Sequence, residues 1–149
     1  MKLSALYQIF LECQSVTTDS RNCPDGSLFI ALKGGSFNGN AFAKLALDSG
    51  CAFAIIDEAE YAVEGDKRYI LVDNCLQTMQ QLANYHRRQL GTRVIGITGT
   101  NGKTTTKELI SSVLCQAHNV LYTLGNLNNH IGVPTTLLRL KPEHDLAVI

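Results

Sequence analysis

The sequence predicts an α/β protein in which a small mixed α/β unit at the N-terminus precedes a unit built on a parallel sheet. Short apolar runs of strand length alternate with segments whose apolar residues recur at helical spacing. A glycine-rich turn at 99–105 also joins an expected strand to an expected helix. The length of 149 residues suffices for one small domain plus a piece of another, but not for two full domains.

The first half of the chain predicts three helices and three strands around a polar loop at 17–26. Glycines bound the apolar run 27–32, which favours a buried strand, and glycines also end the second and third helices. The expected helices are 3–11, 41–49 and 76–90, and the expected strands are 27–32, 52–56 and 69–72. Gly91 then places a domain boundary, which gives domains 1–91 and 92–149.

The second half repeats a strand, loop and helix order, which predicts parallel strands with helices on the faces of the sheet. The expected strands are 93–98, 120–123 and 146–149, and the expected helices are 103–117 and 133–140. The predicted apolar face of the helix 103–117 consists of Leu109, Ile110, Val113, Leu114 and Ala117.

Charge and composition favour a small-molecule partner. Thirteen basic residues balance thirteen acidic ones without a run of five like charges, so neither nucleic acid nor a membrane surface is an expected partner. No signal peptide or membrane-spanning stretch is evident, which predicts a cytoplasmic protein. The five cysteines show no metal-binding spacing and are expected to be free thiols in a reducing compartment.

The segment GTNGKTT has the composition of a loop that binds the phosphates of ATP. Glycines let backbone N–H groups approach phosphate oxygens, Lys103 adds a positive charge, and the Thr104 hydroxyl is the expected Mg²⁺ ligand. The residues predicted to bind ATP are Gly99, Thr100, Asn101, Gly102, Lys103, Thr104 and Thr105. Ile97 stands where the strict pattern has its first glycine, so the loop is a shortened variant. The alternative is a glycine-rich turn that only caps a helix.

This loop after an apolar strand resembles the ATP loop of the Mur ligase superfamily, which also includes folylpolyglutamate synthetase. The resemblance implies that ATP phosphorylates a carboxylate and that an amine attacks the acyl phosphate to form an amide. It implies catalytic roles for Lys103 and Thr104. The expected fold is then a nucleotide-sugar-binding N-terminal domain followed by the truncated start of a P-loop parallel-sheet ATPase domain.

Two more stretches narrow the resemblance. The segment TTDSR at 17–21, with the glycine-rich segment 24–42, resembles the uridine-nucleotide-binding domain of the ligases that add the third and later peptide residues. The segment 123–138 resembles the ligases that join D-Ala-D-Ala to UDP-MurNAc-tripeptide in peptidoglycan synthesis. Alternatively, 17–21 is a turn bonded to its own backbone and the asparagine-rich part is a solvated loop.

The resemblance implies substrate-binding roles for residues in these stretches. They are Thr18, Ser20, Arg21, Lys33, Gly35, Ser36, Phe37, Asn126, Asn128 and Asn129. Arg21 could instead bond its own loop. Lys33 is a candidate phosphate partner or, at comparable odds, a surface charge at the end of a strand.

The resemblance covers only the N-terminal third of a typical member, so we expect further magnesium ligands and the amino-acid contacts to lie outside residues 1–149. The chain alone should then show no ligase turnover, and we expect a monomer. Two other functions stay open: a ligase that adds the third peptide residue, and a non-catalytic nucleotide-sugar-binding module with a vestigial phosphate loop.

Overall fold

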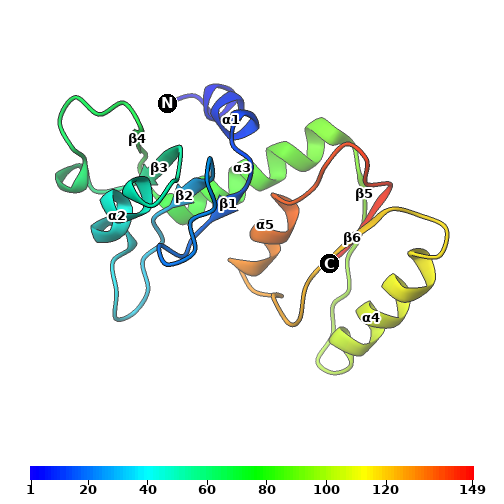
Figure 1. Cartoon of the computed structure of the whole chain (residues 1–149). Coiled ribbons are helices and arrows are strands. Elements are labelled where there is room, and N and C mark those ends of the chain that lie inside the picture. Colours follow the sequence, from blue (N-terminus) through cyan, green and yellow to red (C-terminus); the bar gives the residue numbers. More distant parts are fainter. The chain divides into compact units, whose positions relative to one another are not determined.

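The computed structural model describes all residues from 1 to 149 and divides them into two compact units, Met1–Leu82 and Ala83–Ile149. The division falls inside helix α3 (Cys75–Leu90), before the turn at Gly91 where the sequence analysis places the boundary. Each unit has its own sheet, and both sheets are parallel, which the sequence predicts for the second unit (Figure 1). No helix is both long and apolar enough to cross a membrane.

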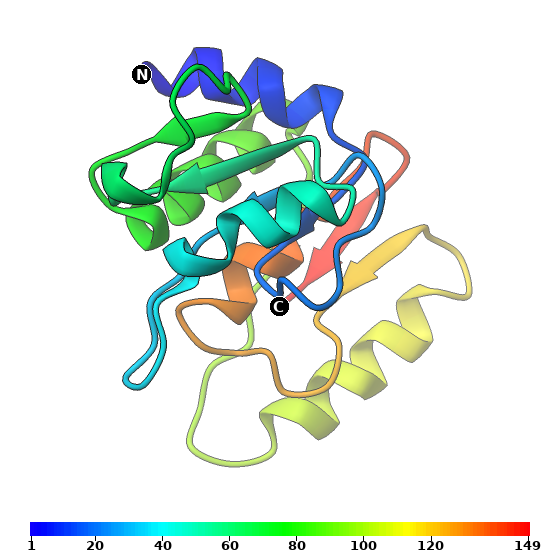
Figure 2. The ribbon, with the colours of Figure 1, turned by 60° about the vertical axis from the view of Figure 1, so that its left-hand side comes forward.

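The first unit contains a four-stranded parallel sheet in the order β1-β2-β3-β4. Its elements are α1 (Leu3–Glu12), β1 (Val16–Thr17), β2 (Leu28–Ile30), the 3₁₀ turn η1 (Gly39–Phe42), α2 (Ala43–Asp48), β3 (Phe53–Ile56), the 3₁₀ turn η2 (Ala59–Tyr61), β4 (Tyr69–Leu71) and the start of α3. Figure 2 shows α2 in front of this sheet and the start of α3 behind it. Helices on both faces explain why β2 and β3 are apolar along their whole length rather than alternating.

The central strands form the core of the first unit. Phe29, Ile30, Ile55 and Ile56 are at most 1% exposed. Full burial of one such side chain contributes roughly 1.5–3 kcal/mol. The buried strands β2 and β3 therefore hold the loops that follow their carboxyl ends in place.

Strand β1 overlaps the start of the segment 17–26 expected to be a polar loop, because it includes Thr17. It has only two residues, both half-buried, so it shows no alternation that periodicity could detect. Its pairing with β2 is parallel, with Val16 opposite Leu28 and Thr17 opposite Phe29. The polar segment after it is therefore held at the edge of the sheet.

The second unit has a three-stranded parallel sheet in the order β5-β7-β6. Its elements after α3 are β5 (Arg93–Ile95), α4 (Lys103–Leu114), β6 (Val120–Tyr122), α5 (Gly132–Leu137) and β7 (Leu146–Val148). The chain moves from β5 past β7 to β6 and then back to β7, so right-handed crossovers place α4 and α5 on opposite faces (Figure 1). The loops after β5 and β6 leave from the same edge of the sheet.

Helix α4 does not bury the apolar face that the sequence predicts. Leu109 and Val113 are 64% and 71% exposed, whereas Lys107 and Ser111 are buried and Ile110 and Leu114 are half-buried. The helix also ends at Leu114, before Ala117. The prediction was wrong because apolar periodicity does not account for a buried lysine whose amine finds carbonyl partners on the neighbouring loop.

His86 is a buried titratable group on α3. Its Nε2 lies 2.9 Å from the carbonyl oxygen of Leu140. Burial lowers the pKa of His86 below its ordinary value, although the Leu140 carbonyl opposes this shift. The unfolded chain therefore binds a proton more readily than the folded one, so the unfolding free energy falls as the pH drops below the ordinary histidine pKa of about 6.5.

We expect the second unit to unfold at lower denaturant when the pH is reduced from about 7.5 to about 5. The variant His86→Gln keeps a donor for Leu140 but cannot titrate, so the pH dependence should shrink. Urea unfolding of both proteins at the two pH values measures this difference. Equal pH dependence in parent and variant would contradict the assignment.

Candidate functional site

The turn after β5 has the backbone of a phosphate-binding loop. Gly99 and Gly102 have positive φ values of 147° and 76°, and Gly102 immediately precedes α4. No side chain caps the helix, so the N–H groups of its first turn are available to an anion. Lys103 Nζ donates to the carbonyl oxygen of Gly99, which folds the amine over the loop. A bound phosphate would compete with this carbonyl for the amine.

These features fit a triphosphate, and the position of Thr104 fits one magnesium ligand. Thr104 lies in the first turn of α4 and is exposed, so its hydroxyl is accessible beside the loop. Residues 1–149 contain no group of three or more His, Cys, Asp or Glu side chains that could hold a metal. Thr100, Asn101 and Thr105 are also exposed in or beside the loop.

The loop after β6 is tied to α4 by Lys107. Its amine donates to the carbonyl oxygens of Thr123 and Gly125, the latter at 2.7 Å, and lies 3.0 Å from the Glu108 carboxylate. Lys107 is one helical turn after Lys103, so the same short helix holds both loops. Lys107 was not predicted from the sequence, where the only available signal is its spacing of four residues from Lys103.

The asparagines of this loop have unequal roles. Asn129 Oδ1 accepts hydrogen bonds from the N–H groups of Ile131 and Gly132, at 3.1 and 2.7 Å, and so holds the start of α5. Its NH₂ group is the part that can face a ligand. Asn126 and Asn128 are exposed in the same loop.

The TTDSR segment at 17–21 forms a local turn, which is the alternative that the sequence left open for it. Arg21 Nε and a terminal nitrogen donate to the two carboxylate oxygens of Asp19, both at 2.9 Å. These bonds lower the pKa of Asp19 to about 2. The Arg21 side chain is nevertheless 87% exposed, so its guanidinium remains accessible from solvent. Thr18 and Ser20 lie half-buried beside it.

The loop after β2 brings Gly35, Ser36 and Phe37 together at an exposed tip. Gly34 N–H donates to the Phe37 carbonyl oxygen at 2.9 Å, and the Phe37 ring lies directly against Gly34. A Cβ added at Gly34 would lie 2.2 Å from Phe37 Cε1, so this contact requires glycine. Lys33, at the base of the loop, is bound by the carboxylates of Asp57 and Glu58, at 3.0 and 2.7 Å.

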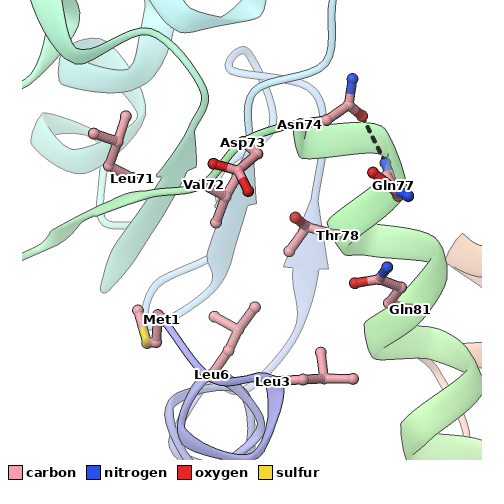
Figure 3. Close-up of a pocket in the computed structure, with 10 residues that line it drawn as sticks. All are labelled: Met1, Leu3, Leu6, Leu71, Val72, Asp73, Asn74, Gln77, Thr78 and Gln81. Carbon is pink, nitrogen blue, oxygen red and sulfur yellow. Dashed lines mark hydrogen bonds between the residues drawn. The ribbon is translucent and has the colours of Figure 1, made fainter.

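A cavity of about 200 Å³ lies elsewhere in the first unit, between α1, the end of β4 and the start of α3. Figure 3 shows Leu3 and Leu6 on one side and Asn74, Gln77 and Thr78 on the other. Asn74 Oδ1 accepts from the Gln77 N–H at 2.8 Å and so stabilises the start of α3. None of the residues predicted from the sequence to bind substrate or ATP lines this cavity.

In the second unit, the first strand of a parallel sheet leads through a glycine-rich loop into a helix whose start has no side-chain cap. This arrangement defines an α/β protein of the phosphate-loop class. The chain belongs to the Mur ligase family. Residues 12–87 match the family described as "Mur ligase family, catalytic domain", and residues 97–149 match the "Mur ligase middle domain". The phosphate loop therefore lies in the middle-domain match.

Curated and solved relatives agree with this family. The chain is 44% identical to the UDP-N-acetylmuramoyl-tripeptide–D-alanyl-D-alanine ligase of Bacillus subtilis, over 90% of this chain and 29% of the relative. A MurF crystal structure from Acinetobacter baumannii superimposes with a TM-score of 0.85 at 34% identity, over 99% of this chain and 35% of that one. MurF ligase from Thermotoga maritima in complex with ADP gives 0.80 at 29% identity, over 93% and 32%. The chain thus spans about 30% of the length of its curated relatives.

Proposed function

We propose that these 149 residues are part of an ATP-dependent ligase of peptidoglycan precursor synthesis. The ligase joins D-Ala-D-Ala to UDP-MurNAc-tripeptide. The γ-phosphoryl group of ATP passes to the terminal carboxylate of the tripeptide, and ADP leaves. The amine of D-Ala-D-Ala then attacks the acyl carbon, the amide forms, and phosphate leaves. The observation that carries the proposal is the loop 99–105 that leads into the uncapped start of α4. The chain that contains it is 44% identical to a UDP-N-acetylmuramoyl-tripeptide–D-alanyl-D-alanine ligase.

The proposed division of labour follows the two halves of the chain. Domain 1–91 binds the nucleotide sugar through its two exposed loops, which are the TTDSR segment at 17–21 and the loop of Gly35, Ser36 and Phe37. Domain 92–149 begins the ATP-binding domain. Lys103 and the amides of the first turn of α4 hold the phosphates, and the Thr104 hydroxyl is a ligand of Mg²⁺, which neutralises phosphate charge. The remaining catalytic groups lie outside residues 1–149. We further propose that the ligase is cytoplasmic and monomeric.

Two alternatives make different demands on the protein. A ligase that adds the third peptide residue would use a single amino acid instead of a dipeptide. The names of the curated relatives favour the dipeptide. A non-catalytic module would bind UDP-sugar without using ATP, and the intact Lys103 and Thr104 speak against decay of the loop.

A chimaera tests the proposal directly. In it, this chain replaces the matching part of the Bacillus subtilis relative, and ADP release is measured with UDP-MurNAc-tripeptide and D-Ala-D-Ala. The amine is D-Ala-D-Ala throughout, because its contacts are expected to come from the relative's part. We expect turnover with UDP-MurNAc-tripeptide and none with UDP-MurNAc-dipeptide. The unmodified relative is the control for assay and folding. Turnover with UDP-MurNAc-dipeptide but not with UDP-MurNAc-tripeptide would identify the third-residue ligase.

The 149-residue chain alone gives a second test. We expect it to bind UDP-MurNAc-tripeptide in calorimetry but to release no ADP when ATP and D-Ala-D-Ala are added. ATP-dependent product formed by the chain alone would show that no group outside residues 1–149 is needed. UDP-sugar binding together with an inactive, folded chimaera would favour the non-catalytic module.

A further inference from the structure

The base of the loop that carries Gly35, Ser36 and Phe37 is closed by a connected polar network. We define the Lys33 clamp as Lys33, Asn38, Asn40, Asp57 and Glu58. We propose that Asp57 and Glu58 are positioning residues that act through Lys33 to fix this loop for nucleotide-sugar binding. This inference rests on the proposed function, because it gives Lys33 a role in the same site other than contact with phosphate.

Glu58 joins both ends of the loop. Its Oε1 lies 2.7 Å from Lys33 Nζ, and its Oε2 accepts a hydrogen bond from Asn38 Nδ2 at 2.7 Å. Lys33 and Asn38 also face each other in an isolated antiparallel bridge. One carboxylate therefore holds the two residues at which the loop leaves and re-enters the body of the unit.

Asp57 is the fixed end of the clamp. Its side chain is only 6% exposed, and its Oδ2 accepts from the N–H of Cys75 at the start of α3, at 3.1 Å. Its Oδ1 lies 2.8 Å from Asn40 Nδ2 and 3.0 Å from Lys33 Nζ. The Asp57 N–H in turn donates to Asn40 Oδ1 at 2.9 Å. Asp57 thus connects the loop to the sheet and to a helix.

The charges of the clamp argue against a direct phosphate contact by Lys33. One ammonium group is shared by two carboxylates, so the trio carries one excess negative charge. The hydrogen bond from Lys33 holds the pKa of Glu58 below its ordinary value. Burial raises the pKa of Asp57, but bonds from Cys75, Asn40 and Lys33 outweigh this effect and lower it. Both acids are therefore ionised near neutral pH, and a phosphate at Lys33 would meet their repulsion.

The two roles for Lys33 predict opposite effects of Glu58→Gln. If Lys33 bound phosphate, loss of the competing carboxylate would leave UDP-sugar affinity unchanged or raise it. If Lys33 holds the loop, the same substitution weakens binding. We expect Glu58→Gln and Lys33→Met each to weaken binding about tenfold, and the double variant to be no weaker than either single one.

Calorimetry of UDP-MurNAc-tripeptide binding to the 149-residue chain measures this cycle. Glu60→Gln is the matched control, because it removes an exposed acid of η2 that is not part of the clamp. Lys33→Arg should restore most of the affinity, since arginine can still bridge two carboxylates. Additive losses, or unchanged or tighter binding by Glu58→Gln, would overturn the proposal.

Amide exchange tests the clamp without any ligand. The Gly34 N–H is bonded within the loop, so Glu58→Gln should speed its exchange about tenfold or more while the amides of β2 and β3 keep theirs. Unchanged exchange at Gly34 would overturn the clamp itself. If the parent chain fails to bind UDP-MurNAc-tripeptide but its loop loosens in Glu58→Gln, the proposed function fails and the clamp stands.

Discussion

Replacing Lys103 by alanine should reduce ATP-dependent ligation by the chimaera by about 10²-fold or more, while UDP-MurNAc-tripeptide binding changes little. Lys103 is the first residue of α4, and its amine already lies over the loop on the Gly99 carbonyl. In the proposed ATP site, this amine would neutralise charge on the outer phosphates as it develops. The two exposed loops of the first unit do not depend on this amine.

The measurement pairs ADP release with calorimetric binding of the nucleotide sugar by the same variant. Lys141→Ala is the control, since it removes an exposed lysine of the same unit that lies far along the chain from the loop. Loss of both ligation and UDP-sugar binding in Lys103→Ala would show that the two sites are not separated as proposed. Normal ligation would remove Lys103 from the site altogether.

The backbone of the loop at 99–105 could be predicted from the sequence because its determinants are local. A strand, two glycines that take positive φ and a helix start all lie within a dozen or so residues, and each has a recognisable residue type. The parallel sheet of the second unit followed in the same way from the alternation of strands and helices. Element ends were less well placed, as with β5, which ends at Ile95 rather than at 98.

The partners of the site residues could not be predicted because they come from distant parts of the chain. Lys33 and Asp57 meet only because β2 and β3 are parallel neighbours, so that their carboxyl ends share one edge. That rule could have brought Asp57 and Glu58 into consideration, since both directly follow an apolar strand. The orientation of α4 had no such signal, because apolar Leu109 and Val113 are exposed whereas Lys107 is buried.

Lys107→Met should loosen the loop after β6 and destabilise the second unit. Methionine keeps the apolar stem of the side chain but leaves the Thr123 carbonyl oxygen without its donor in a buried position. An unsatisfied buried acceptor such as the Thr123 carbonyl costs about 1–3 kcal/mol. The Gly125 carbonyl adds little to this cost, because Gly125 is exposed and water can replace the lysine amine there. The loop carries Asn126, Asn128 and Asn129, so its loosening would also reach the proposed substrate contacts.

Urea unfolding and amide exchange over residues 123–132 measure the two effects. Glu108→Gln is the matched control on the same helix, because it removes only the half-exposed ion-pair partner of Lys107 and leaves both carbonyl bonds in place. In the chimaera, we expect Lys107→Met to impair ligation even though Lys103 and Thr104 are intact. Such a loss would indicate that α4 must hold the phosphate loop and the asparagine loop together. Full activity with a loosened loop would instead limit Lys107 to stabilising the fold.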